Sequence, residues 1–380
     1  MKKTIPQVQK NRAATVRERS IIRSYIRKNI FSNAPITICI FAIAFMFFSG
    51  CLENQSQIKS NGALRIDTCA GMTNYLKKQN LPALESVQTW ENRYGPGLKL
   101  TTSHYEILTT LLEPLMLSQV PGFVESSYRS YQSQLPKPAE TTSKFTIYLF
   151  ATRQQWEDFT KAFTGPQAAL YCKIKAGAYY LNGACVAYNI GRERTFSVLG
   201  HEGWHQFNSR YFKYRLPSWL DEGIAMQFEI SRYEQGLFYF EPAQNLYRLG
   251  GLKKTLIENQ MIPVKELVSI NPGQVVAVSD QAVTAFYCQS YALVRFLRED
   301  DYGRRLGNFH QLLLGGLRGS WPLDEAAKKI AADRNIPLTV AWNKAVGSQL
   351  FQQYIADFDQ IQADYTAFCK KLVYRVRFKN

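Results

Sequence analysis

Two short motifs near the middle of this 380-residue chain constrain its fold most. The first is His-Glu-x-x-His at residues 201–205, and the second is Leu-Pro-x-Trp-Leu-x-Glu-Gly-x-Ala at residues 216–225. On a helix, His201 and His205 are four positions apart and share one face, so their imidazoles can bind one divalent ion. Glu202 can then reach a water molecule beside that ion without binding the ion itself. The first motif therefore predicts a helix that carries a metal site.

A metal site that catalyses hydrolysis needs a third protein ligand and an open position for water. Glu222 is the candidate, because it follows His205 by 17 positions in a second segment with a helical pattern. Gly203 and Gly223 lack side chains, which predicts that the two helices approach each other closely. Asp221 is a candidate for a side chain that orients one of the ligands.

Taken together, the two motifs resemble those of the gluzincin metallopeptidases, and most of all the bacterial peptidase-MA-like proteins. The resemblance implies a zinc ion on His201, His205 and Glu222, with Glu202 activating water to cleave peptides or proteins. The chain holds only four histidines, which argues against a chance pairing at this spacing. Two alternatives stay open: a catalytically silent surface protein that uses this fold for binding or assembly, and hydrolysis of a non-protein amide such as a cell-wall crosslink.

The segment before the metal helix predicts a β-hairpin. Asn182-Gly183, within residues 176–189, is a strong signal for a two-residue turn. The resemblance implies that part of residues 177–188 borders the cleft and pairs with the substrate as an added strand. An ordinary edge hairpin fits the same pattern equally well. The metal helix itself is predicted from Thr195 to about Tyr211, with Gln206 in a structural role because amides seldom act in acid–base steps.

The remaining pattern predicts an α+β fold, with a small mixed sheet and helices over residues 67–170 and a mostly helical part carrying the metal helix over residues 171–380. Strands are expected at 98–102, 105–109 and 145–150. Helices are expected at 64–78, 121–134, 152–163, 281–298, 304–314, 324–333, 337–346 and 349–372. Thr152 and Gln155 predict a capping box at the start of one of them.

Two tyrosines of the predicted helix at residues 281–298 are candidates for stabilising an oxyanion near the metal. Tyr287 is the first candidate and Tyr291 the second. Both lie on an apolar helical stripe, a position where a tyrosine more often packs in the core.

The N-terminal segment predicts export. Residues 1–34 hold nine Lys/Arg against one acid, so this leader contributes +8 of the net charge of +16, and the charge does not indicate a nucleic-acid partner. Residues 36–48 are almost wholly apolar, and Phe48-Ser49-Gly50-Cys51 resembles the lipobox of bacterial lipoproteins. We therefore expect a signal segment at residues 1–50 and lipidation of Cys51. A polar tether at residues 51–66 would follow, placing the protein at a membrane of the bacterial cell envelope, outside the cytoplasm. An uncleaved signal anchor is the alternative.

The other cysteines bear on disulfide pairing. After Cys39 and Cys51 of the leader, five remain, and an oxidising compartment favours pairing between some of them. Cys172 and Cys185 flank the predicted hairpin region and are candidates for a bridge. Because five is odd, at least one thiol is expected to stay free.

Overall fold

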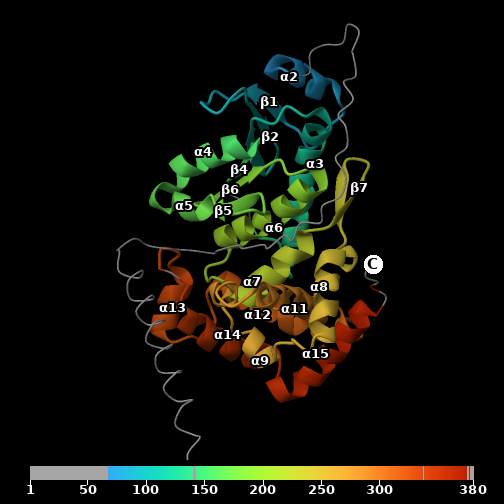
Figure 1. The fold of residues 1–380 in the computed structure, drawn as a ribbon, viewed down its shortest axis with the longest axis vertical. Coiled ribbons are helices and arrows are strands. Elements are labelled where there is room, and N and C mark those ends of the chain that lie inside the picture. The colour runs from blue at the N-terminus through green and yellow to red at the C-terminus, as the bar shows by residue number, and fades with distance from the viewer. Residues whose placement is uncertain (1–66, 140–142, 337, 375, 377–380) are drawn as a thin grey trace, which may run out of the picture.

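The computed structural model describes residues 67–139, 143–336, 338–374 and 376. The predicted signal segment, tether and lipidated Cys51 therefore lie outside the described residues. Figure 1 shows a sheet with its helices in one half and a helical region in the other, joined by α6 and α7. The α+β prediction is confirmed. Within the described ranges, no helix combines the length and hydropathy that crossing a bilayer requires.

A six-stranded mixed sheet forms the N-terminal half, in the order β1-β2-β3-β4-β6-β5. The pairs β3/β4 and β4/β6 are parallel, and the other neighbours are antiparallel. The strands are β1 Ser86–Thr89, β2 Leu98–Thr101, β3 Tyr105–Thr109, β4 Phe145–Phe150, β5 Ala178–Leu181 and β6 Ala184–Tyr188. The three predicted strands and the hairpin are confirmed. The domain boundary predicted at residue 170 precedes β5 and β6, which pair in this same sheet.

Helices cover both faces of this sheet. They are α2 Cys69–Lys78, α3 Pro114–Gln132, α4 Arg153–Thr164 with its continuation η1 Gly165–Gln167 and α5 Ala168–Tyr171, and α6 Arg192–Tyr211. Every residue of β6 is buried: Cys185 and Ala187 belong to the core that includes α3 and α6, whereas Val186 and Tyr188 pack with Trp156 of α4. A strand buried on both faces has no polar alternation, which explains the apolar composition of β6.

Several helix boundaries differ from the prediction. The helix expected at 304–314 continues to Arg318, the helix expected at 337–346 continues to Tyr354, and the metal helix begins at Arg192. The helix expected at 121–134 begins at Pro114, because the Glu113 carboxylate caps the first turn, and Pro121 lies inside the helix. The continuous helix expected at 349–372 is broken, because Asp357 caps a new helix by accepting a hydrogen bond from the amide of Asp359. The capping box of Thr152 and Gln155 is confirmed.

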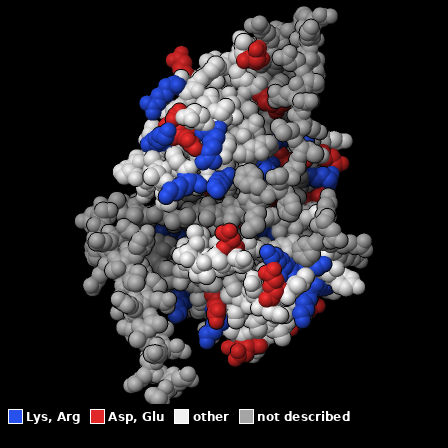
Figure 2. All heavy atoms as spheres, in the orientation of Figure 1, with Lys and Arg blue, Asp and Glu red and all other residues white. Residues whose placement is uncertain are grey.

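The C-terminal half is helical apart from one hairpin. Its elements are α7 Ser218–Ala225, η2 Met226–Phe228, β7 Ser231–Glu234, β8 Leu237–Phe240, η3 Pro242–Gln244, α8 Leu246–Ile257, α9 Val264–Leu267, α10 Pro272–Val276, α11 Asp280–Glu299, η4 Asp300–Gly303, α12 Leu306–Arg318, α13 Glu325–Ala332, α14 Val340–Tyr354 and α15 Phe358–Val373. Helix α7 packs between α6 and α11. On the face shown in Figure 2, acidic and basic side chains are interspersed, as expected for a solvated surface.

The two glycines expected to bring α6 and α7 together have other neighbours. A Cβ on Gly203 would lie 2.4 Å from the hydroxyl of Tyr131 in α3. A Cβ on Gly223 would lie 2.6 Å from the carbonyl oxygen of Ser290 in α11. Helices α6 and α7 do contact each other, as predicted, but these two glycines are not the reason for it. Each glycine instead lets its own helix pack against a third element.

Replacement of Gly223 by alanine is expected to lower the free energy of unfolding by roughly 1–3 kcal/mol, the usual cost of overpacking, because the carbonyl of Ser290 belongs to helix backbone and cannot move aside. Gly250→Ala is the matched control, since a Cβ on this other helical glycine meets nothing within 4 Å. The control should be neutral or slightly stabilising. Urea unfolding of both variants tests this, and equal midpoints would contradict it.

Candidate metal centre

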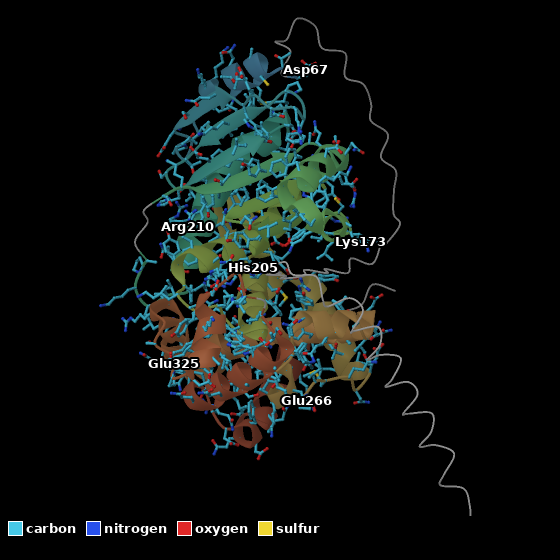
Figure 3. All side chains as sticks on the ribbon, turned by 90° about the vertical axis from the view of Figure 1, so that its left-hand side faces the viewer. Asp67, Lys173, His205, Arg210, Glu266 and Glu325 are labelled. Carbon is cyan, nitrogen blue, oxygen red and sulfur yellow. The ribbon has the colours of Figure 1, made fainter. Side chains whose placement is uncertain are left out.

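Helices α6 and α7 bring the three predicted ligands together. His201, His205 and Glu222 are 0%, 4% and 4% exposed, and each offers a ligand atom that lies within 4.8 Å of the other two. The Nε2 atom of His201 lies 3.4 Å from Oε2 of Glu222. Figure 3 places His205 where the sheet half meets the helical half. This group could hold a metal ion.

Asp221 orients His205, as the sequence predicts. Its Oδ1 atom lies 3.1 Å from Nδ1 of His205 and also accepts hydrogen bonds from Nε1 of Trp204 and Nδ2 of Asn208, both at 2.9 Å. Burial raises the pKa of Asp221, but the charge of His205 and these hydrogen bonds outweigh it, so the pKa is lowered. An ionised carboxylate can only accept, so Nδ1 of His205 must donate. Nε2 of His205 is then the nitrogen that can bind a metal ion.

Glu229 does the same for His201, and sequence reasoning missed it. Its Oε1 lies 3.1 Å from Nδ1 of His201, and Arg248 forms two hydrogen bonds to the same carboxylate, at 2.6 and 2.9 Å. Asn245 donates a further one, at 2.8 Å. Burial raises the pKa of Glu229, but Arg248 outweighs burial and holds it at about 2. Glu229 follows Glu222 by seven positions, a helical spacing that could have suggested it. Its partner Arg248 approaches only through the packing of α8.

Neighbouring carboxylates favour positive charge at both histidines. Burial lowers the pKa of His201, but the hydrogen bonds and charges of Glu222 and Glu229 outweigh it and raise the pKa to about 10. Burial likewise lowers the pKa of His205, and Asp221 and Glu222 raise it overall. These carboxylates therefore favour protons on both imidazoles, in competition with a metal ion. A metal ion must displace them, which makes its affinity increase with pH.

The donor set fits zinc. Two imidazole nitrogens and one carboxylate oxygen form a common ligand set of catalytic zinc sites. Bonds of about 2.0–2.1 Å in a tetrahedron place ligand atoms roughly 3.3 Å apart, close to the 3.4 Å between His201 and Glu222. The carboxylates of Asp221 and Glu229 supply the outer hydrogen bonds that imidazole ligands of zinc usually have.

Glu202 lies beside this group but is not one of the three candidate ligands. It is 1% exposed, and its Oε2 makes no hydrogen bond with the described residues. Burial raises the pKa of Glu202, while the charges of His201 and His205 partly oppose the increase. A hydrogen bond to the backbone of Tyr180 in β5 also acts on this carboxyl group. A buried carboxylate with a raised pKa is suited to accept a proton near neutral pH.

Other contacts of α6 keep its ligands in place. Nε2 of Gln206 donates to the carbonyl oxygens of Thr146 in β4 and Gly183 in the hairpin turn, both at 2.8 Å. The hydroxyl of Tyr131 donates to the carbonyl of Gly200 at 2.7 Å. Gln206 thus joins the metal helix to the sheet, which agrees with its predicted structural role.

The two tyrosine candidates have different surroundings. The hydroxyl of Tyr291 donates to the carbonyl of Pro242 and accepts a hydrogen bond from Arg295, which fits packing better than catalysis. The buried ring of Tyr287 lies 5.6 Å from the guanidinium carbon of Arg248, the partner of Glu229. A role for Tyr287 at an oxyanion stays a prediction.

The bridge considered between Cys172 and Cys185 is absent, and all five described cysteines are free thiols. Cys185 belongs to the core on the α3/α6 face of the sheet. Cys172 caps α5, and its carbonyl accepts a hydrogen bond from Arg153 at the start of α4, on the opposite face. The sheet therefore separates the two thiols, which their positions in the sequence could not show.

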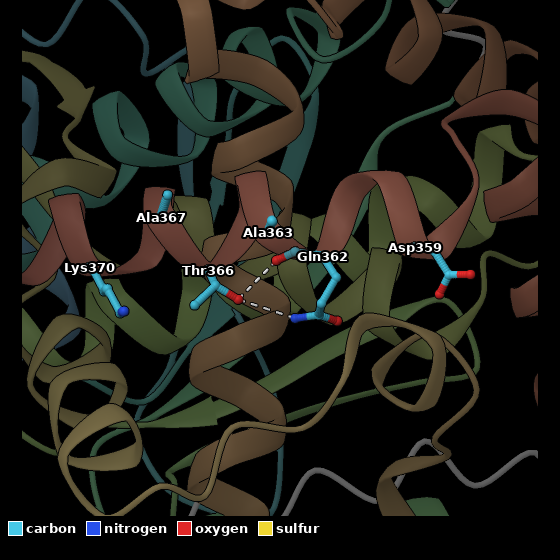
Figure 4. A pocket seen from close by; sticks show the side chains of 6 residues that line it. All are labelled: Asp359, Gln362, Ala363, Thr366, Ala367 and Lys370. Atoms are coloured by element: carbon cyan, nitrogen blue, oxygen red, sulfur yellow. Dashed lines mark hydrogen bonds between the residues drawn. The ribbon is translucent and has the colours of Figure 1, made fainter.

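One large hollow of about 610 Å³ has no part in this centre (Figure 4). It lies along one face of α15, where Gln362 and Thr366 bond each other and Asp359 and Lys370 lie toward the two ends. Its described lining brings together no group of metal-ligating side chains, since Asp359 is its one carboxylate and Lys370 its one cation.

No family model, curated protein sequence or solved structure matches this chain. Its function is therefore inferred from its own side chains and their geometry.

Replacement of Asp221 by asparagine is expected to weaken zinc binding roughly 10- to 100-fold, the usual effect of losing an outer hydrogen bond to a ligating histidine. The amide keeps the size of the carboxylate but loses its charge and can reverse the direction of its hydrogen bonds. Competition with a chromogenic zinc chelator measures the change. Asp280→Asn, at an exposed aspartate of α11, is the control, and an equal affinity in the two variants would contradict the role of Asp221.

Proposed function

We propose that this protein is a zinc-dependent metallopeptidase that cleaves peptides or proteins outside the cytoplasm. One observation carries the proposal: a buried His201–His205–Glu222 group lies beside Glu202, a buried carboxyl group that is not one of the three candidate ligands. Carboxylates hold both imidazoles in the orientation that a metal needs. The resemblance of the two motifs to those of gluzincins supports the same chemistry.

The residues have distinct roles in the proposed reaction. When bound, zinc acts as a Lewis acid that polarises the scissile carbonyl and makes a water molecule more acidic. Oε2 of Glu202 accepts a proton as the water oxygen attacks the carbonyl carbon. Glu202 then passes that proton to the amide nitrogen as the C–N bond breaks, releasing a carboxylate and an amine. Asp221 and Glu229 hold the imidazole rings in place throughout.

The β5 strand supports binding of an extended peptide. Among the described strands it lies at the edge of the sheet and pairs with β6 alone. The amide of Tyr188 donates to the carbonyl of Gly177, so by alternation the peptide groups of Ala178 and Tyr180 point away from β6. Tyr180 is also the residue whose backbone bonds Glu202. A substrate that adds as a strand along this edge would therefore pass beside the proposed base.

Attachment to a membrane through lipidated Cys51 is part of the proposal and depends on the lipobox-like sequence alone. A lipid anchor and a polar tether would hold the peptidase near its substrates at the cell envelope. Mass spectrometry of the protein purified from bacterial membranes tests this, since lipidation adds diacylglycerol to an N-terminal Cys51.

The central test is the metal content and peptide turnover of the purified protein. We expect one zinc per chain, measured by atomic emission, and cleavage of members of a degenerate peptide library, measured by mass spectrometry. Full zinc occupancy without turnover would overturn the peptidase proposal and favour a binding or assembly protein. Turnover of purified cell-wall fragments but not of peptides would redirect the proposal to a non-protein amide.

A further inference from the structure

A pocket of about 410 Å³ lies where the first turns of α6 meet α3 and the β7–β8 hairpin. Phe196 of α6, Tyr233 of β7 and Phe238 of β8 supply aromatic rings to its wall. The ring centroids of Tyr233 and Phe238 are 5.0 Å apart, and those of Phe196 and Phe238 are 5.1 Å apart. The pocket can therefore hold an aromatic side chain, which would pack against these rings.

Gln119 of α3 adds a polar group to this wall. Its side chain is 7% exposed, lines the pocket and makes no hydrogen bond with the described residues. A buried amide without a hydrogen bond costs free energy, and this amide can both donate and accept. A hydroxyl group on the bound ring would satisfy it, which makes tyrosine the best match among aromatic side chains.

The charged groups of the lining do not favour an ion. Arg192 and Glu193 are exposed, lie at neighbouring positions and carry opposite charges. The carboxylate of Glu229 also lines the pocket, but it already accepts hydrogen bonds from Asn245 and Arg248. A neutral side chain therefore fits this pocket better than a cation or an anion.

The pocket lies along the outer edge of β7, which pairs with β8 alone among the described strands. The amide of Glu241 donates to the carbonyl of Ile230, so by alternation the peptide groups of Ser231 and Tyr233 point away from β8. Both residues line the pocket, and these outward peptide groups make no hydrogen bond with the described residues. Strand β8, in contrast, packs against α3. The edge of β7 can therefore pair with an extended peptide.

We propose that the β7 edge binds an extended segment of a peptide substrate and that the pocket holds an aromatic side chain of that segment, tyrosine above all. The inference rests on the proposed peptidase function only in treating the bound peptide as a substrate. Glu229, in the wall of the pocket, lies 3.1 Å from Nδ1 of His201, whereas Nε2 of His201 faces Glu222. The bound segment would therefore lie near the metal centre but apart from the scissile bond, and would anchor the substrate.

Fluorescence anisotropy with short labelled peptides tests the pocket. The peptides carry Tyr, Phe or Ala at one central position in a degenerate background, and the Glu202→Gln variant is used so that cleavage does not interfere. Phe should bind roughly 10- to 100-fold more tightly than Ala, the effect of burying an aromatic side chain. Tyr should bind roughly 3- to 10-fold more tightly than Phe, the effect of one hydrogen bond. Equal affinity for all three would overturn the inference.

Gln119→Leu, made in the same background, is the informative variant. It removes the hydrogen-bonding group and nearly keeps the size of the side chain, so the advantage of Tyr over Phe should disappear while Phe still binds. Gln260→Leu is the control, since Gln260 is an exposed glutamine that does not line the pocket. The control should keep the advantage of Tyr. An advantage that persists in Gln119→Leu would place the peptide elsewhere, for example along β5, and overturn the inference.

Methylation of the peptide backbone tests strand pairing without any change to the pocket. In an added strand, every second amide of the peptide donates to β7, and the amides between them point away. Methylation of one set should weaken binding on the order of 10-fold, because it removes hydrogen bonds, and methylation of the other set should have little effect. Equal effects of the two sets would contradict strand addition.

The outcomes separate this inference from the peptidase proposal. If the peptides bind as expected and none is cleaved by the unmodified protein, the β7 site is supported and the hydrolase is overturned. If peptides are cleaved, the tyrosine segment is joined to a cleaved peptide through Gly-Ser linkers of graded length. KM should then fall on the order of 10-fold with kcat unchanged, as for binding that is equal in the ground and transition states. An unchanged KM at every length would overturn the role of β7 and leave the peptidase proposal intact.

Discussion

Glu202→Gln is expected to lower kcat for peptide hydrolysis by roughly 10²- to 10⁴-fold, the contribution of a positioned general base. Glutamine has the same shape as glutamate and cannot accept the proton of water at this step. Because Glu202 is not one of the three candidate ligands, the zinc content should remain at one per chain. KM should change little, since the lost interaction forms only in the transition state.

Steady-state kinetics on one cleaved library peptide, together with metal analysis of the same samples, tests this expectation. Glu193→Gln is the control, because Glu193 is an exposed glutamate in the first turn of the same helix, α6. The control should keep the activity of the unmodified protein. Activity of the Glu202→Gln variant within a few-fold of the control would rule out Glu202 as the base, and loss of its zinc would make Glu202 a structural part of the site.

Removal of zinc is expected to destabilise the fold as well as abolish activity. At a free zinc concentration 1,000 times the dissociation constant, binding to the folded state alone contributes about 4.1 kcal/mol. The ligands come from two helices, α6 and α7, so the ion joins them only when the protein is folded. Glu222→Gln should remove most of this zinc-dependent stabilisation, because an amide is a poor replacement for a carboxylate ligand.

Thermal and urea unfolding with and without zinc measure the effect. Glu266→Gln is the control, since Glu266 is an exposed glutamate of the helical half, remote in sequence from the ligands (Figure 3). The control should show the full zinc-dependent increase in the unfolding midpoint. An equal increase in Glu222→Gln would exclude Glu222 as a ligand. No increase in the unmodified protein would contradict the metal centre.

Local patterns predicted the local structure well. The alternation in β2, β3 and β4, the Asn182-Gly183 turn and the capping box of Thr152 and Gln155 all appear as expected. These signals work because each depends on residues within a few positions of one another. The errors arose where a local signal had two meanings: Pro121 suggested a helix start but lies inside α3.

Contacts between distant segments decided what the sequence could not. Gly203 and Gly223 correctly indicated close packing, but the elements that approach them are α3 and α11. The predicted disulfide between Cys172 and Cys185 is wrong because the sheet separates the two residues. The neighbours of the two glycines and the separation of the two cysteines both depend on which helices and strands the fold places beside them. The residue types alone do not determine this.

From the sequence alone we predicted His201, His205 and Glu222 as ligands, Glu202 as the base and Asp221 as an orienting residue. A spacing of four on a helix and two adjacent motifs indicate which side chains face one another. Only the tertiary structure decided the rest: Glu229 and Arg248 behind His201, the β5 edge beside Glu202, and Arg334 in the wall of a cavity that His205 also lines. Those partners are separated along the chain by 19 to 129 residues. Helical or strand periodicity cannot relate positions so far apart, and only the burial of their helices and strands in one core brings them into contact.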